Sequence, residues 1–201
     1  MINGVIFDLD GTIWDSIHFR IDSWKKAFKD YGLDADPEII QLMIGYPGSM
    51  LIKKMKMKDP NIEMLEEKYY NEHLNEVKFF PDVENTFKEL RKRDIKIGIV
   101  TSSRREMINK INLNVDAIVT MDDIKNGKPD IEPYMKATDI MKIKPENTMV
   151  VGDIDNDLIP SKILNCVSIL VTHGIKKESE HKDYEIKEIH EILKIIDEKN
   201  L

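Results

Sequence analysis

Three short apolar runs along the chain each end at a polar residue. They are GVIF at 4–7, IKIGIV at 95–100 and TMVVG at 148–152, and the residues that follow them are Asp8, Thr101 and Asp153. Isoleucine and valine at successive positions are typical of strands buried on both faces, as in a parallel sheet covered by helices. We therefore expect three parallel strands that end next to these three polar side chains.

Between these runs, apolar residues recur at helical spacing. The segments with this amphipathic pattern are residues 82–94, 103–112 and 131–142. Strands that alternate with helices predict right-handed βαβ units, and hence an α/β fold with a doubly wound parallel sheet. In such sheets ligands bind at the carboxyl ends of the strands, so Asp8, Thr101 and Asp153 are expected to converge there.

Residues 15–80 have helix-like patterns only. The candidate helices are 22–32, 36–45, 48–59 and 62–77, punctuated by glycines and prolines. Pro81 marks the return to the alternating pattern. We expect an all-helical cap at 15–80, inserted into a core made of residues 1–14 and 81–201. Such a cap can open and close over a site and exclude water from it.

Composition narrows the class of protein. Hydrophobic residues make up 41% of the 201 residues and charged residues 33%, and no segment approaches the roughly 18 uninterrupted apolar residues of a membrane span. The start MINGVIFDLDG lacks the basic and long apolar parts of a signal peptide, which predicts a cytoplasmic protein without a membrane partner. The net charge of −7 disfavours nucleic acid as a partner. Cys166, the single cysteine, is expected to be a buried structural thiol.

The first cluster of candidate chemistry is FDLDGT at 7–12. Two carboxylates one residue apart, just past a buried strand, suit a nucleophile and a proton shuttle. Asp8 would attack phosphorus, and Asp10 would protonate the leaving group and then deprotonate water. The alternatives are an incidental surface turn and a calcium loop. The calcium loop fails on spacing, because Ile13 and Phe19 would occupy its glycine and glutamate positions.

Two further motifs gain meaning from their order after the first. In VTSS at 100–103, the Thr101 hydroxyl and the Ser102 amide suit the binding of phosphoryl oxygens, although such residues also cap helices. In GKP at 127–129, Lys128 can neutralise the charge that builds up when a phosphate dianion approaches a carboxylate. Because the chain has 30 lysines and arginines, only its position singles this lysine out.

The segment VVGDIDND at 150–157 predicts a magnesium site. Mg²⁺ prefers carboxylate oxygens, with water and substrate phosphate completing its octahedron. Asp153 is the expected direct ligand. Asp157 is expected to orient a metal-bound water or another ligand without binding the ion directly. Asp8 and the backbone carbonyl of Asp10 would share the ion. The alternative is a solvated acidic turn.

In this order, FDLDGT, VTSS, GKPDIEPY and VVGDIDND resemble the four motifs of the haloacid dehalogenase superfamily, and most closely its phosphoglycolate phosphatase-like branch. The resemblance covers nearly the whole chain and implies a Rossmann-like core with a helical cap between the first and second motifs. It also implies a magnesium-dependent phosphatase that forms an aspartyl-phosphate on Asp8. Relatives that dehalogenate or cleave phosphonates lack the second aspartate, so Asp10 favours phosphoryl transfer. VTHG at 171–174 looks like the turn after the last core strand.

Some positions depart from the family pattern. Ile154 stands where a serine is common, and Pro160 and Ser161 stand where small alanines often follow. Arg20 occupies the place where many relatives have a histidine, and His18 lies two residues before it. His18 and Arg20 are candidates for substrate contacts from the cap, with an ordinary surface or packing role as the alternative.

Three functions are compatible with these motifs. The first is hydrolysis of a small phosphorylated metabolite, with 2-phosphoglycolate as the named substrate. The second is a sugar-phosphate mutase, which forms the same phosphorylated Asp8 but passes the phosphoryl group to a second hydroxyl. The third is a non-catalytic phosphate-sensing or signalling module, such as a receiver-like domain, although receivers lack the cap insertion. We expect a monomer or a homodimer.

Overall fold

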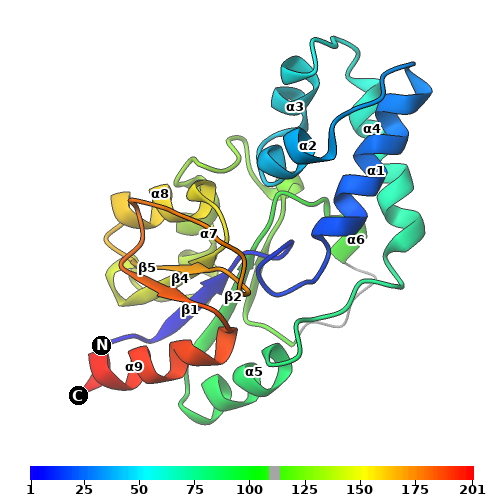
Figure 1. Ribbon diagram of the computed structural model, residues 1–201. Coiled ribbons are helices and arrows are strands. Elements are labelled where there is room, and N and C mark those ends of the chain that lie inside the picture. The colour runs from blue at the N-terminus through cyan, green and yellow to red at the C-terminus, as the bar shows by residue number, and fades with distance from the viewer. Residues whose placement is uncertain (109–113) are drawn as a thin grey trace. The chain divides into compact units, whose positions relative to one another are not determined.

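The computed structural model of the protein describes residues 1–108 and 114–201 (Figure 1). The chain forms two compact units, Met1–Trp14 with Phe79–Leu201, and Asp15–Lys78. The cap expected from the sequence, residues 15–80, begins at the same residue as the second unit and ends two residues later. Each unit has a hydrophobic core of its own.

A six-stranded parallel sheet forms the centre of the first unit (Figure 1). Its strands are β1 (Gly4–Phe7), β2 (Lys96–Val100), β3 (Ala117–Val119), β4 (Thr148–Gly152), β5 (Val167–Val171) and β6 (Tyr184–Ile186). They lie in the order β3-β2-β1-β4-β5-β6. The first strand is therefore central and the chain winds outward from it in both directions, which confirms the predicted doubly wound α/β sheet.

The register of the three predicted strands brings their carboxyl ends together. Gly4 is level with Lys96 of β2 and with Thr148 of β4, so β1 lies between these two strands. Every residue of β1 and β4 is buried, as continuous apolar runs require in a sheet covered on both faces. The amide of Asp8 donates to the carbonyl of Val151 (2.9 Å), which fixes the residue after β1 against β4.

Helices cover both faces of this sheet (Figure 1). They are α5 (Val83–Lys92) and α9 (Ile192–Asn200) on one side, and α7 (Glu132–Met141) and α8 (Asp155–Ile163) on the other. Successive side chains of a strand point to opposite faces. The Phe7 ring therefore packs against Phe87 of α5, with 5.2 Å between ring centroids. Its neighbour Ile6 packs in a cluster with Tyr134 and Ala137 of α7.

Three strands and part of one helix differ from the sequence-based prediction. β3 and β6 have three residues each, which is too short for a hydrophobic pattern, and Ser168 interrupts the apolar run of β5. VTHG does follow β5, but β6 pairs with β5 beyond it, so the expectation of a turn after the last core strand is wrong. Of the helix predicted at 103–112, the structure shows α6 (Arg105–Ile108), and 109–113 lie outside the described residues.

Short 3-10 helices also belong to the first unit, at η1 (Met121–Asp123), η2 (Pro145–Asn147) and η3 (Ile189–Glu191). Cys166 is buried in the core cluster of the α7 face, which confirms the predicted buried thiol. Burial raises the pKa of this thiol to about 12, so the reactive thiolate is not populated at neutral pH.

The second unit, Asp15–Lys78, is all-helical. Its helices are α1 (Ile17–Asp30), α2 (Pro37–Met43), α3 (Gly48–Lys54) and α4 (Asn61–His73). Trp24 and Phe28 of α1 stack on each other, with ring centroids 5.5 Å apart, and pack with apolar residues from the other helices into one core. Gly32 follows α1 with a φ of 77°, the left-handed conformation that ends many helices.

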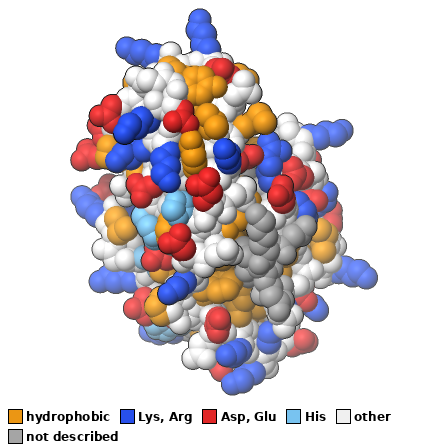
Figure 2. Space-filling model, turned by 90° about the vertical axis from the view of Figure 1, so that its right-hand side faces the viewer, with side chains coloured by type: hydrophobic (Ala, Val, Ile, Leu, Met, Phe, Trp, Pro, Cys, Tyr) orange, Lys and Arg blue, Asp and Glu red, His pale blue; other side chains and the backbone are white. Residues whose placement is uncertain are grey.

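Charged side chains of both signs are interspersed over the face of the molecule in Figure 2. In the part of the chain that the structure describes, no helix combines the length and the apolar character needed to cross a membrane.

Candidate active site

Three aspartates meet at the carboxyl ends of β1 and β4. Asp8 follows β1, Asp153 follows β4, and Asp157 lies in the first turn of α8. One carboxylate oxygen from each lies within 4.8 Å of the others. All three residues are buried, with exposed fractions of 8%, 8% and 1%. Buried carboxylates this close together repel each other, so the cluster needs compensating cations or protonation of one of its members.

Gly152 is what allows Asp157 to come so close to the end of β4. A Cβ atom added at Gly152 would lie 2.3 Å from the Cβ of Asp157, well inside van der Waals contact. Any larger residue here would push the first turn of α8 away from the sheet. Sequence reasoning missed this requirement, although the glycine directly before Asp153 was visible in VVGD.

Lys128 supplies a cation between two of the three aspartates. Its Nζ lies 2.5 Å from Oδ1 of Asp8 and 2.6 Å from Oδ1 of Asp157. Burial alone would lower the pKa of Lys128, but the charges of Asp157 and Asp8 outweigh it and raise the pKa. The lysine is therefore a permanent positive charge beside the candidate nucleophile, although Lys128 and Asp8 are 120 residues apart in the chain.

The electrostatics of the buried aspartates call for a further cation. Burial raises the pKa of Asp8 to about 7, against the opposing effect of Lys128, and the charge of Asp157 adds to the rise. Burial also raises the pKa of Asp153, which Lys177 opposes from 2.7 Å. A nucleophilic carboxylate must be ionised. Additional positive charge near Asp8 would keep it so at neutral pH.

Tyr134 orients Asp157 from the side of α7. Its hydroxyl donates to Oδ1 of Asp157 at 3.0 Å, and burial raises the pKa of the phenol well above its ordinary value, so the group remains a donor. The other oxygen of Asp157, Oδ2, is buried and accepts no hydrogen bond from any described residue. A buried carboxylate oxygen without a partner, close to two further carboxylates, fits a hard divalent cation such as Mg²⁺.

Removing the Tyr134 hydroxyl is expected to destabilise the protein. Tyr134→Phe deletes a buried hydrogen bond to a charged group, so the free energy of unfolding should fall by about 1–2 kcal/mol. Urea denaturation measures this change. Tyr184→Phe is the matched control, because Tyr184 is only half-buried and its hydroxyl makes no hydrogen bond within the described part of the chain. A Tyr134→Phe protein as stable as this control would contradict the assigned contact.

Asp10 lies apart from the carboxylate trio and contacts the second motif. Its Oδ2 accepts a hydrogen bond from the Ser103 hydroxyl at 2.9 Å, and the Ser103 amide donates to Oγ1 of Thr101 at 3.0 Å. Gly11 has a φ of 81°, a left-handed conformation that suits a tight turn directly after Asp10. Ser102 is exposed. The sequence singles out Ser102 for its backbone amide. The buried hydroxyl of Ser103, in the same VTSS motif, was not predicted.

His173 is a further residue that sequence reasoning missed. Its Nε2 lies 2.9 Å from the carbonyl oxygen of Thr12, and its ring stacks on Phe80 with 3.5 Å between centroids. His173 therefore ties VTHG to the turn that follows Asp10. The sequence feature that could have identified His173 is its position in VTHG, the segment that resembles a turn of the family.

His18 and Arg20, the predicted cap candidates, lie in α1 of the second unit. The guanidinium of Arg20 lies 3.2 Å from Oε1 of Glu66 and stacks over the Tyr70 ring at 3.6 Å. These contacts join α1 to α4, which matches the packing alternative for Arg20. The His18 side chain is 57% exposed and lies against Phe19.

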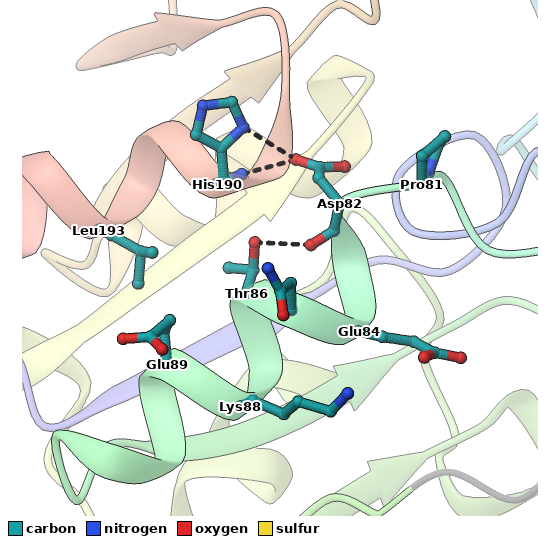
Figure 3. Close-up of a pocket in the computed structure, with 9 residues that line it drawn as sticks. Pro81, Asp82, Glu84, Thr86, Lys88, Glu89, His190 and Leu193 are labelled. Atoms are coloured by element: carbon teal, nitrogen blue, oxygen red, sulfur yellow. Dashed lines mark hydrogen bonds and ion pairs between the residues drawn. The ribbon is translucent and has the colours of Figure 1, made fainter.

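Asp82, Glu188 and His190 form a second group of potential metal ligands, and Asp82 and His190 line a hollow beside α5 (Figure 3). Oδ2 of Asp82 already accepts a hydrogen bond from the His190 amide at 2.7 Å. The side chains of His190 and Glu188 are 54% and 63% exposed. These bonds fasten the start of α5 to η3. None of the strand-end aspartates lines this hollow.

Comparisons with known proteins identify relatives of this chain. Residues 5–171 match the model of the family described as haloacid dehalogenase-like hydrolase. The chain is 31% identical to a protein named pyrophosphatase PpaX from Oceanobacillus iheyensis, with 97% of each chain covered. It is 27% identical to a phosphoglycolate phosphatase from Aquifex aeolicus, with 96% of each covered.

Solved structures show the same fold. A putative phosphoglycolate phosphatase from Lactobacillus plantarum superposes with a TM-score of 0.88 at 19% identity, covering 97% of this chain and 99% of that one. A β-phosphoglucomutase from Clostridium difficile superposes with a TM-score of 0.87 at 21% identity, covering 99% and 97%. With a family model matched over residues 5–171, the chain belongs to the haloacid dehalogenase-like hydrolase family.

Proposed function

We propose that this phosphatase of the haloacid dehalogenase-like family is magnesium-dependent and hydrolyses a small phosphate compound through an aspartyl-phosphate on Asp8. Inorganic pyrophosphate is our first candidate substrate, because a relative 31% identical over 97% of the chain is named a pyrophosphatase. 2-Phosphoglycolate is the second, from the more distant phosphoglycolate phosphatase. The observation that carries the mechanism is Asp8 itself, buried at a strand end with Lys128 at 2.5 Å.

In the first chemical step, a carboxylate oxygen of Asp8 attacks phosphorus, and the bond from phosphorus to the leaving oxygen breaks. Asp10 gives its proton to that oxygen. The Ser103 hydroxyl, 2.9 Å from Oδ2 of Asp10, holds this carboxyl group in place. Lys128 and the Thr101 hydroxyl stabilise the negative charge on the phosphoryl oxygens.

In the second step, Asp10 takes a proton from a water molecule, and the resulting hydroxide attacks the phosphorus of the acyl phosphate. The bond between phosphorus and Asp8 breaks, which releases phosphate and restores the carboxylate. Asp8 and Asp153 would hold Mg²⁺, with Asp157 orienting it, and the ion would neutralise the charge of the transferring phosphoryl group. Lys128 remains bound to Asp8 and Asp157 and keeps both carboxylates in position.

A mutase remains the second candidate function, since it uses the same phosphorylated Asp8. The likeness to a β-phosphoglucomutase supports the shared fold only. The non-catalytic signalling hypothesis has less support, because the chain belongs to a family of hydrolases. A small phosphorylated metabolite is the partner that we propose, and a cytoplasmic location is in keeping with such a partner.

Phosphate release from a panel of compounds tests the substrate. We expect the highest kcat/KM with pyrophosphate, a lower value with 2-phosphoglycolate, and turnover of an aryl phosphate without any bisphosphate cofactor. A higher kcat/KM with 2-phosphoglycolate than with pyrophosphate would make 2-phosphoglycolate the first candidate substrate. Conversion of a sugar phosphate to its isomer, dependent on a sugar bisphosphate and without phosphate release, would establish the mutase instead.

A further inference from the structure

Lys177 occupies a position that the proposed mechanism does not use. Its Nζ lies 2.7 Å from Oδ2 of Asp153, the expected direct magnesium ligand. Lys128 bonds to Asp8 and to Asp157. Two lysines thus form the ion pairs of the three clustered carboxylates, and Lys177 is the one that pairs with Asp153.

The two lysines are held differently. The Lys128 side chain is 4% exposed and contacts two carboxylates, whereas the Lys177 side chain is 22% exposed and contacts one. Lysine is a compact charge on a flexible four-carbon stem, so its ammonium group can leave one partner without moving the backbone. Lys177 is therefore the cation that can be removed from the site while Lys128 remains.

The backbone around Lys177 is anchored on both sides. The segment lies between β5 and β6, and before Lys177 the amide of Ile175 donates to the Thr172 carbonyl at 3.0 Å. After it, the Ser179 hydroxyl donates to Asp155 of α8, and Ser168 of β5 donates to the His181 carbonyl at 2.6 Å. Release of the ammonium group thus requires a change of side-chain rotamer only.

A divalent cation and the Lys177 ammonium compete for the same carboxylate. Both need Asp153, and two cations at one carboxylate repel each other. We propose that Lys177 is an internal counter-ion of Asp153, which compensates its charge in the metal-free protein and is displaced when Mg²⁺ binds. This inference rests on the magnesium site of the proposed function. It makes Lys177 a residue that sets the metal affinity of the site.

Isothermal titration with Mg²⁺ tests the proposal on the full chain. If about one molecule in ten has Lys177 detached, Lys177→Met should bind Mg²⁺ about tenfold more tightly than wild type. Lys177→Arg keeps the charge and should bind as weakly as wild type. Lys176→Met is the matched control, because Lys176 is exposed and pairs only with Glu178 among the ion pairs described, at 3.3 Å.

Unfolding by urea gives a second readout. Without metal, Lys177→Met should unfold at a lower urea concentration than Lys176→Met, and saturating Mg²⁺ should close this gap. Equal Mg²⁺ affinity in Lys177→Met and wild type, or weaker binding in Lys177→Met, would overturn the counter-ion while leaving the magnesium site intact. No Mg²⁺ binding by any of the four proteins would overturn the magnesium site, and the counter-ion with it.

Discussion

Asp8→Asn is expected to reduce turnover to the background rate while the protein remains folded. The substitution keeps the size of the side chain and removes the carboxylate that attacks phosphorus. An amide is a poor nucleophile. Among the described residues, the other carboxylate that contacts Lys128 is Asp157, which belongs to the first turn of α8 and not to the end of β1. Phosphate release under substrate saturation measures the loss, and circular dichroism confirms the fold.

The matched control for this variant is Asp94→Asn. Asp94 is exposed, and its left-handed φ of 56° is one that asparagine tolerates. It should turn over at the wild-type rate. A fully active Asp8→Asn protein, shown by mass spectrometry to contain no wild-type chain, would refute Asp8 as the nucleophile.

Asp10→Asn is expected to lower kcat by about 10²–10⁴-fold, because an amide can neither give a proton to the leaving group nor accept one from water. The Ser103 hydroxyl can still bond to the asparagine oxygen, so the turn should keep its shape. The loss should therefore lie mainly in kcat, with KM little changed.

The leaving group separates the two roles of Asp10. An aryl phosphate has a good leaving group that needs little protonation, so its first step should be almost unaffected by Asp10→Asn. The second step needs the base for every substrate. Rapid quenching should then show phosphorylated enzyme that accumulates with the aryl phosphate. Equal slowing of phosphoenzyme formation with alkyl and aryl substrates would contradict the acid role.

The fold could be predicted where the pattern was local and continuous. GVIF and TMVVG are buried along their whole length, and their apolar runs showed it. β3 and β6 could not be predicted, because three residues have no period and their strand conformation comes from pairing with β2 and β5. Arg20 illustrates a similar limit, since its partner Glu66 lies 46 residues further along the chain.

The sequence predicts which residues belong to the site better than it predicts the contacts between them. Asp8, Lys128 and Asp157 were named, and the structure brings them together. The roles of Tyr134, Ser103 and Lys177 were not predicted. Each depends on contact with an aspartate that is distant in the sequence, and only the folded chain brings the two together. Gly152 was missed for the same reason, since its role is the space it leaves for Asp157.

The most direct test of the mechanism is the location of the phosphoryl group during turnover. Wild-type protein is mixed with Mg²⁺ and substrate, quenched in acid within milliseconds, digested with a protease and analysed by mass spectrometry. We predict a phosphorylated peptide with the modification on Asp8, absent from Asp8→Asn and absent when a chelator replaces Mg²⁺. Rapid turnover with phosphate on another residue, or with no phosphorylated peptide at any quench time, would contradict the account.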